Sequence, residues 1–222
     1  MPRNRRGLVV LAKWPRAGRA KRRLGEAIGA RASTTLAYAF LRDTAALAEH
    51  SGADTILVAF APPSADDRIG HVFVGARLVA QPLGSFGTRL ARALEDGHAR
   101  SRYVVLIGTD SPTLDPRVVR DAFLALESGA GCVLGPSRDG GFYLIGCSAP
   151  LPPSLFRQMP WSTSAVFALT RDRARAAGLA VTVLPAGYDV DDAASLALLR
   201  ADRAGLRRAR ETAAALRRLD AA

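Results

Sequence analysis

The 222-residue chain has only two cysteines and no long apolar run. Cys132 and Cys147 could pair in principle, but both lie in stretches that predict strands, where isolated thiols are more often ordinary core residues. Hydrophobic residues make up 49% of the chain, so a core can form without disulfides. No stretch approaches the roughly 20 apolar residues that span a bilayer, so we expect no membrane span.

The N-terminus also lacks a complete secretory signal, although basic residues there precede an apolar run. That run, Leu8 to Ala12, ends at Lys13 and is shorter than the roughly 7–15 residues of a signal core. No small-residue cleavage site follows it. We therefore expect a cytoplasmic location.

Motifs for nucleic-acid binding are absent as well, despite a formal net charge of +11 that favours contact with phosphates. The arginines are scattered, and neither an RNA-binding aromatic motif nor a helix-turn-helix pattern is present. Nucleic acid is therefore not the expected ligand. Lys13 and Lys21 are the only lysines among 31 basic residues, and both fall in one short loop. A requirement for a compact ammonium would explain this placement, as would chance.

Short apolar runs alternate with longer amphipathic stretches, which predicts βαβ units and a mostly parallel sheet. We expect strands at 7–12, 55–60, 77–81, 103–107, 132–135, 142–147 and 180–184. We expect helices at 33–49, 86–99, 116–127 and 163–177, and from 192 to about 219 with a break near Gly205. The expected N-caps are Ser33, Asp115 and Asp192.

One segment departs from this alternation. Asp139-Gly140 between two apolar runs predicts a hairpin turn. Neither an internal repeat nor an interdomain linker is evident. We therefore expect a single domain over residues 1–222, with a helical C-terminal tail from about 193.

The loop after the first strand, residues 13–24, is basic and contains Gly18, which permits a tight backbone path. Exposed amides together with Lys13, Lys21 and Arg22 would cradle a pyrophosphate. The loop is neither a P-loop nor a dinucleotide fingerprint. A solvated basic loop is the alternative.

Carboxylates follow two other predicted strands. Asp110 emerges from a buried strand, where it needs a cation, a helix cap or water. Mg²⁺, which is held by one or two carboxylates and substrate phosphates, suits that position, and capping of the next turn is the alternative. Asp189 and Asp191 share one face of an extended stretch and would repel unless a metal or an arginine lies between them. This favours Asp191 as a second metal contact, with a surface acidic turn as the alternative.

Two weaker segments complete the pattern. The glycine-containing stretch 81–89 is a candidate contact to a base or ribose. A loop without a binding role is the alternative. The stretch 138–141 is a candidate contact to a second substrate, although its hairpin role alone explains the glycines. Ligands of open α/β sheets bind at the carboxyl ends of the strands, so we expect these clusters to converge there.

In this order, the motifs resemble a bacterial family of largely uncharacterised, glycosyltransferase-like proteins with the GT-A fold. More distantly, they resemble phospholactate guanylyltransferase and the molybdenum-cofactor nucleotidyltransferases. The resemblance runs from about Gly7 to Leu199. It rests on Lys13…Pro15…Gly18…Lys21-Arg22-Arg23-Leu24, Gly108-Thr109-Asp110-Ser111-Pro112, Asp139-Gly140-Gly141-Phe142-Tyr143-Leu144-Ile145-Gly146, Trp161-Ser162-Thr163 and Asp189-Val190-Asp191. It implies a three-layer α/β nucleotide-diphospho-sugar transferase fold with a mostly parallel central sheet.

The resemblance also implies roles for single residues. The residues implied to bind the nucleotide or its phosphates are Lys13, Gly18, Lys21, Arg22, Gln81 and Gly84. Asp110 and Asp191 are implied to hold Mg²⁺ or Mn²⁺, and Lys21 and Asp110 are the catalytic candidates. The acceptor-side candidates are Asp139, Gly140 and Gly141. The chain departs from its relatives in the loop, which reads Lys21-Arg22-Arg23 where they commonly have Lys-Thr-Arg. Asp110 also stands without the second aspartate of a D-x-D motif.

These assignments imply a Mg²⁺-dependent transferase that uses a nucleotide-sugar donor. The alternative is a nucleotidyltransferase that moves a nucleoside monophosphate from a triphosphate to a small phosphorylated acceptor and releases pyrophosphate. A further alternative is a nucleotide-binding module without catalysis. The expected partners are thus a nucleoside triphosphate or nucleotide-sugar and a small acceptor.

Overall fold

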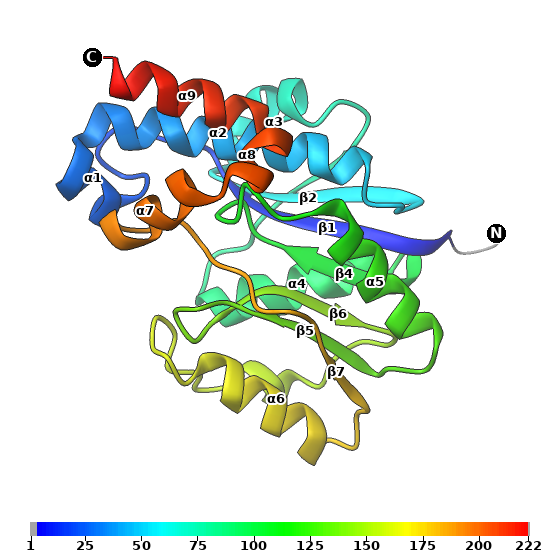
Figure 1. Cartoon of the computed structure of the whole chain (residues 1–222). Helices are drawn as coiled ribbons and strands as arrows, with labels where there is room; N and C mark the ends of the chain where they lie inside the picture. The colour runs from blue at the N-terminus through cyan, green and yellow to red at the C-terminus, as the bar shows by residue number, and fades with distance from the viewer. Residues whose placement is uncertain (1–3, 222) are drawn as a thin grey trace.

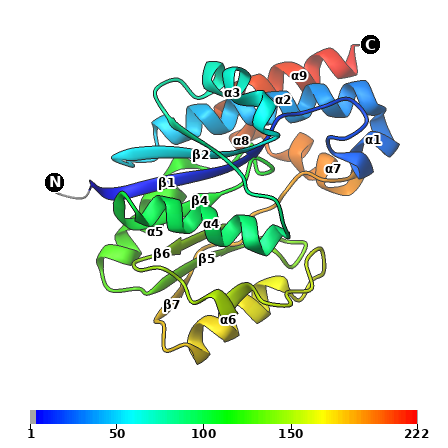
Figure 2. The same cartoon turned by 180° about the vertical axis from the view of Figure 1, so that it is seen from behind.

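The computed structural model describes residues 4–221 and has three layers, with helices on both faces of a central seven-stranded sheet (Figures 1 and 2). All seven strands expected from the apolar runs are present. They are β1 (Asn4–Lys13), β2 (Thr55–Ala61), β3 (Arg77–Ala80), β4 (Ser101–Ile107), β5 (Cys132–Pro136), β6 (Phe142–Cys147) and β7 (Val181–Val183).

The strand order is β3-β2-β1-β4-β6-β5-β7. β6 is antiparallel to both of its neighbours, and the other adjacent pairs are parallel. The predicted hairpin is therefore confirmed, and its turn is closed by the amide of Ser137, which donates to the carbonyl of Gly141 at 3.0 Å. Because only β6 is reversed, the carboxyl ends of the other strands lie at one edge of the sheet.

The helices cover the two faces unequally. They are α1 (Arg22–Ile28), α2 (Ala30–Glu49), α3 (Asp66–Val72), α4 (Phe86–His98), α5 (Pro116–Glu127), α6 (Val166–Ala176), α7 (Ala193–Ala201), α8 (Arg203–Arg208) and α9 (Arg210–Asp220). Two short 3₁₀ helices, Pro63–Ala65 and Pro153–Phe156, join them. One face of the sheet packs on α2, α3 and α5, and the other packs on α4 and α6.

Alternation along β1 explains these two cores. Leu8 and Val10 belong to the core beneath α2 and α5, whereas Val9 points to the opposite core beneath α4. A third cluster joins α1, α2, α7 and α9 through side chains such as Leu24 and Phe40. Each fully buried side chain of this size contributes about 1.5–3 kcal/mol to folding.

Several expected boundaries differ from the structure. Ser33 is wrong as an N-cap, because α2 already begins at Ala30 and the buried Ser33 hydroxyl donates to the carbonyl of that residue. The C-terminal helix is interrupted at Asp202 and Ala209, and Gly205 lies inside α8. The side chain of Asp202 accepts the amide of Gly205 and starts this helix.

The other expected caps are confirmed. Asp115 accepts the amide of Arg117 at the start of α5, and Asp192 forms a capping box with Ser195 at the start of α7. α1 and α3 were not expected from the sequence. No helix within residues 4–221 is long and apolar enough to cross a membrane. The ends of the expected domain, residues 1–3 and 222, lie outside the described residues.

The C-terminal tail is anchored through a buried carboxylate. α9 lies along α2 (Figures 1 and 2), and Asp43 of α2 accepts the amides of Glu211 at 3.1 Å and Thr212 at 2.7 Å. These amides belong to the first turn of α9, where a helix leaves its own donors unsatisfied. Asp43 therefore joins the tail to the helix that borders the site described below.

Asp43→Ala should lower the free energy of unfolding by about 1–3 kcal/mol, because the buried amide of Thr212 and the partly buried amide of Glu211 lose their acceptor. Urea denaturation followed by circular dichroism measures this change. Asp121→Ala, on the exposed surface of α5, is the matched control and should change the value by less than about 0.5 kcal/mol. Equal effects of the two substitutions would contradict the anchoring role.

Candidate functional site

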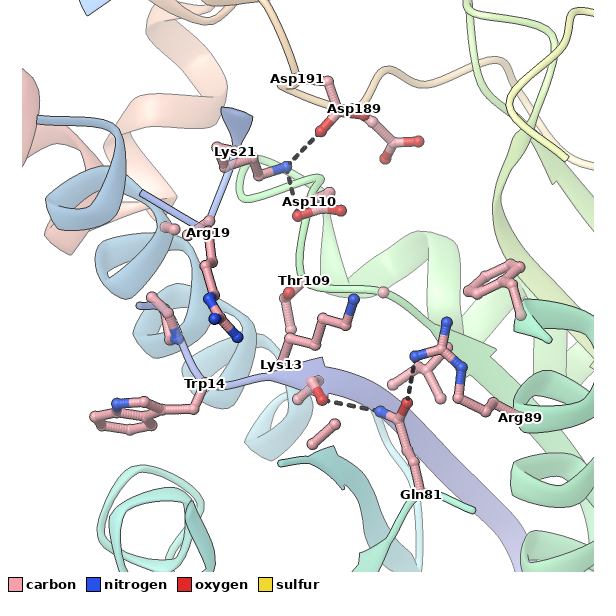
Figure 3. A pocket seen from close by; sticks show the side chains of 18 of the residues that line it. Lys13, Trp14, Arg19, Lys21, Gln81, Arg89, Thr109, Asp110, Asp189 and Asp191 are labelled. Carbon is pink, nitrogen blue, oxygen red and sulfur yellow. Dashed lines mark hydrogen bonds and ion pairs between the residues drawn. The ribbon is translucent and has the colours of Figure 1, made fainter. Parts of the chain in front are cut away.

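A cavity of about 630 Å³ opens at the carboxyl edge of β1, β2 and β4. Its charged lining residues are Lys13, Arg16, Arg19, Lys21, Arg89, Asp110, Asp189 and Asp191. Its aromatic and aliphatic lining includes Leu11, Trp14, Phe86, Leu90, Leu106, Phe142 and Tyr143. Figure 3 shows Lys21, Asp110 and Asp191 grouped on one side of Lys13, and Gln81 and Arg89 grouped on the other.

The Lys21 ammonium lies between two carboxylates. Its Nζ is 2.5 Å from Asp110 Oδ1 and 2.8 Å from Asp191 Oδ1, and only 7% of the side chain is exposed (Figure 3). Burial acts to lower the pKa of Lys21, but the charges of Asp110 and Asp191 outweigh it and raise that pKa. Lys21 is therefore an ammonium at neutral pH. The expected convergence of the first loop on the aspartates is present in the structure.

The backbone of Lys21 is left-handed, with φ 48° and ψ 54°, and directly precedes α1. Only a few per cent of residues other than glycine adopt this conformation, which costs on the order of 1–3 kcal/mol. Gly18, with φ 71°, makes the earlier bend in the same loop. The ammonium also lies 5.7 Å from the centre of the buried Phe40 ring. The loop therefore folds inward at Lys21, whereas the next residue, Arg22, is exposed.

Backbone contacts bring the two carboxylates together. The amide of Val190 donates to the carbonyl of Asp110 at 2.8 Å, and the Val190 side chain is fully buried. Asp191 follows at once, and its own amide donates to the hydroxyl of Ser195 in α7. The residues on both sides of Asp191 are thus fixed by packing and by the capping box, which holds its carboxylate toward Lys21.

Asp189 has a different partner. It accepts a short hydrogen bond from the hydroxyl of Ser111, in the loop after β4. Burial raises the pKa of Asp189 to about 6, the charge of Asp110 adds to this shift, and the Ser111 hydrogen bond opposes it. The sequence predicted that Asp189 and Asp191 would share one cation. The structure instead gives each its own polar partner.

The two carboxylates fit a metal ion whose coordination shell is completed by a substrate. Asp110 and Asp191 direct one oxygen each at a single cationic atom, so both reach one small cation. Mg²⁺ in phosphate-transfer sites is commonly held by one or two carboxylates together with phosphates and water. No group of three or more histidine, cysteine, aspartate or glutamate residues within the described part of the chain is arranged to hold a metal by itself.

The side-chain amide of Gln81 is hydrogen-bonded to neighbouring protein groups. Its Nε2 donates to the carbonyls of Ala12 at 2.9 Å and Ala59 at 2.7 Å, which joins the ends of β1 and β2. Its Oε1 then accepts from Arg89 Nη1 at 3.3 Å. Gln81 lines the cavity as expected, but both of its amide hydrogens already have acceptors. It positions Arg89 of α4 beside the cavity.

Arg89 has donors to spare. Within the described residues its guanidinium forms one hydrogen bond and no ion pair, and its Nε is buried without a partner. The guanidinium also lies over the Phe86 ring, with Cζ 5.8 Å from the ring centre. A half-buried cation without a counter-charge is costly, so this guanidinium suits a ligand that offers acceptors.

Of the remaining residues predicted to bind the ligand, some line the cavity and others do not. Lys13 lines the cavity and is exposed, whereas Gly18, Arg22 and Gly84 are exposed and are not among its lining residues. The acceptor-side candidates lie outside the lining as well. Among them, Gly140 has φ 87°, and a Cβ there would lie 2.3 Å from the Cα of Ser164. The left-handed turn and the close approach of Ser164 therefore account for this glycine without a ligand.

Sequence reasoning missed several lining residues. Arg16 and Arg19 belong to the loop that was identified, but the loop path decides which of its cations face the cavity. Arg89 belongs to the segment 81–89, whose glycines were the basis for predicting a base or ribose contact. Its place in the first turns of α4, four residues after the N-cap Ser85, is the signal that would have identified it.

Solved structures share the fold. A Desulfovibrio desulfuricans G20 protein, whose name assigns it to the nucleotide-diphospho-sugar transferases, has a TM-score of 0.87 at 28% identity over 97% of this chain and 95% of that chain. A manganese complex of Mycobacterium tuberculosis Rv0371c has a TM-score of 0.52 at 18% identity over 89% and 99%. CMP:2-keto-3-deoxy-manno-octonic acid synthetase with CTP has 0.51 at 15% over 90% and 98%.

The last two likenesses are of fold alone. The comparison with curated proteins gives no match. The architecture is the three-layer α/β GT-A-like fold that the resemblance implied. Residues 43–163 match the family described as uncharacterized protein conserved in bacteria (DUF2064), and the match covers more than half of the chain. The chain therefore belongs to the DUF2064 family.

Proposed function

We propose that this protein is a metal-dependent nucleotidyltransferase, which transfers a nucleoside monophosphate from a triphosphate to a small acceptor and releases pyrophosphate. The observation that carries the proposal is the convergence of Lys21, Asp110 and Asp191 at one side of a cavity whose other side is largely apolar. A nucleotide has the same division, with charged phosphates at one end and a flat base at the other.

The basic loop favours a triphosphate donor. Lys13, Arg16 and Arg19 line the cavity together with Lys21. Four cations offer charge-assisted hydrogen bonds to a triphosphate, which carries more negative charge than the diphosphate of a nucleotide-sugar. These cations come from one segment, residues 13–21, so they would contact the phosphate chain from one side and stabilise a pyrophosphate leaving group.

In the reaction, a phosphate oxygen of the acceptor attacks the α-phosphorus, so that no proton has to be removed, and the bond from that phosphorus to the oxygen bridging to the β-phosphate breaks. Lys13 and the loop arginines stabilise the charge that develops on pyrophosphate. Asp110 and Asp191 would hold the divalent ion, which neutralises phosphate charge when it is bound. No enzyme nucleophile is needed, and neither carboxylate forms a bond to phosphorus.

The apolar side of the cavity suits the nucleobase. Phe86, Leu106 and Phe142 offer apolar surface to the faces of a flat ring. Arg89, held by Gln81, offers N–H groups to the edge of the ring. A guanidinium pairs with two adjacent acceptors, which guanine presents at O6 and N7, as does cytosine at O2 and N3. Adenine has no such edge.

Glycosyl transfer from a nucleotide-sugar is the second candidate, and the name of the 28% identical Desulfovibrio protein favours it. The same cations would then bind a diphosphate, and the acceptor would attack the anomeric carbon. A nucleotide-binding module without catalysis would bind the same donors but would not consume them.

Asp110→Asn should abolish the Mg²⁺-dependent part of nucleotide binding, because a neutral amide is a poor ligand for the ion. A thermal-shift screen of nucleoside triphosphates and nucleotide-sugars, with and without Mg²⁺, measures this. A donor present at a hundred times its Kd stabilises the wild type by about 2.7 kcal/mol. Asp121→Asn is the control and should behave as the wild type.

An unchanged Mg²⁺ response in Asp110→Asn would show that the metal assignment is wrong. Stabilisation by nucleotide-sugars alone would favour the glycosyl-transfer candidate. Pyrophosphate release with a triphosphate and a panel of small phosphorylated acceptors then tests turnover, and binding without any release would favour the binding module.

Arg89→Met should weaken binding of the preferred nucleoside triphosphate about 5- to 150-fold and flatten the preference among the four bases, because a fork of this kind contributes about 1–3 kcal/mol of discrimination. Affinity for inorganic triphosphate should stay the same. Isothermal titration of GTP, CTP, ATP and UTP measures both. Arg92→Met, on the same helix but paired with Asp96, is the control. Equal base preferences in Arg89→Met and the wild type would refute this role.

A further inference from the structure

The Lys21 ammonium occupies the position that a divalent ion on Asp110 and Asp191 would need. Its Nζ lies 2.5 Å and 2.8 Å from the two Oδ1 atoms. Mg²⁺ binds carboxylate oxygens at about 2.0–2.1 Å, so an ion shared by the same two oxygens would lie almost on the nitrogen. Repulsion between the charges excludes both cations from the position at once.

We infer that Lys21 is a resident counter-ion, which closes the metal site in the nucleotide-free protein and yields it when nucleotide phosphates enter the cavity. The inference rests on the proposed function, because phosphate is the group that would draw the ammonium away. The metal and the nucleotide would then bind as a pair, and neither would bind tightly alone.

The charges around Lys21 favour this exchange. Two carboxylates and one ammonium leave one net negative charge, which the exposed guanidinium of Arg23, 3.5 Å from the second oxygen of Asp191, offsets only from the solvent side. A divalent ion in place of the ammonium would bring a second positive charge to the two oxygens that Lys21 now contacts. The displaced ammonium would then pair with phosphate instead of losing its partners inside the protein. Burial of an ammonium is tolerated only with such partners, so Lys21 stays on the carboxylates until phosphate is present.

The surroundings allow Lys21 to move. Its side chain is a flexible four-carbon stem, and Lys21 itself lines the cavity that would receive the phosphates. The carboxylates do not need to move, because 49% of the Asp110 side chain and 34% of the Asp191 side chain are already exposed to incoming ions and water. A rotation of one side chain is therefore sufficient.

Such an exchange couples the two ligands, and coupling is reciprocal. Nucleotide should raise the affinity for the metal by the factor by which the metal raises the affinity for nucleotide. In the absence of nucleotide, Lys21 also relieves the repulsion between Asp110 and Asp191. The site thus stays assembled without retaining an ion.

The test is Mn²⁺ binding to the full chain without nucleotide, measured from the electron paramagnetic resonance signal of free Mn²⁺. Lys21→Met should bind Mn²⁺ at least tenfold more tightly than the wild type. A non-hydrolysable triphosphate analogue should raise the Mn²⁺ affinity of the wild type at least tenfold and that of Lys21→Met much less. Lys21→Asn is a second neutral variant, and asparagine tolerates the left-handed backbone.

Lys13→Met is the matched control, because it removes the other ammonium of the same loop, which forms no ion pair within the described residues. Its nucleotide-free Mn²⁺ affinity should stay within twofold of the wild type. Equal or weaker Mn²⁺ binding in both Lys21 variants without nucleotide would overturn the inference, and the proposed function would survive if Asp110→Asn still removes Mn²⁺ binding with the analogue. A wild type that shows no Mn²⁺ response to any nucleotide would overturn the proposed function as well.

Discussion

The contact on which the site depends is the Lys21 ammonium held between Asp110 and Asp191. It joins the loop after the first strand, the end of β4 and the segment after β7. A buried ammonium is tolerated only beside such partners, and two carboxylates this close tolerate each other only with a cation between them. The three segments therefore stabilise one another, and the position of each limits the freedom of the other two.

The sheet explains why such distant segments meet. β1 and β4 are parallel neighbours, so the chain leaves both at the same edge. The segment after β7 begins at the edge strand of the sheet, three strands away from β4, and runs back toward β1 and β4 before α7 begins (Figure 1). The hydrogen bond from Val190 to the carbonyl of Asp110 fixes where it arrives. Topology and one backbone contact thus assemble a charged cluster that no local sequence contains.

Much of the scaffold could be predicted from the sequence, because continuous apolar runs identify buried parallel strands directly. The Asp139-Gly140 turn likewise indicated the reversed strand, and Asp115 and Asp192 indicated helix starts. The short helices α1 and α3 escaped prediction, since few apolar positions define them. Ser33 failed as a cap because α1 turns directly into α2 at Gly29, so that the helix already begins at Ala30.

The site could be predicted only as a set of loops at one edge. Lys13, Lys21, Gln81, Asp110 and Asp191 do line one cavity. The pairing of Lys21 with Asp191 spans 170 residues of sequence, and no local pattern encodes it. Which arginines face inward depends on the loop path and on the orientation of α4. The composition determines neither the loop path nor the orientation of α4. Arg89 could therefore be identified as a lining residue only from the structure.

In the stretch from Tyr188 to Asp192, each of five consecutive residues has a different role. Tyr188 bonds Thr113 and Asp202, Asp189 bonds Ser111, Val190 packs in the core, Asp191 pairs with Lys21, and Asp192 caps α7. An insertion or deletion of one residue here would misplace all five at once. Among related chains this return segment should therefore keep a constant length, while the surface loops at the opposite edge of the sheet are free to lengthen.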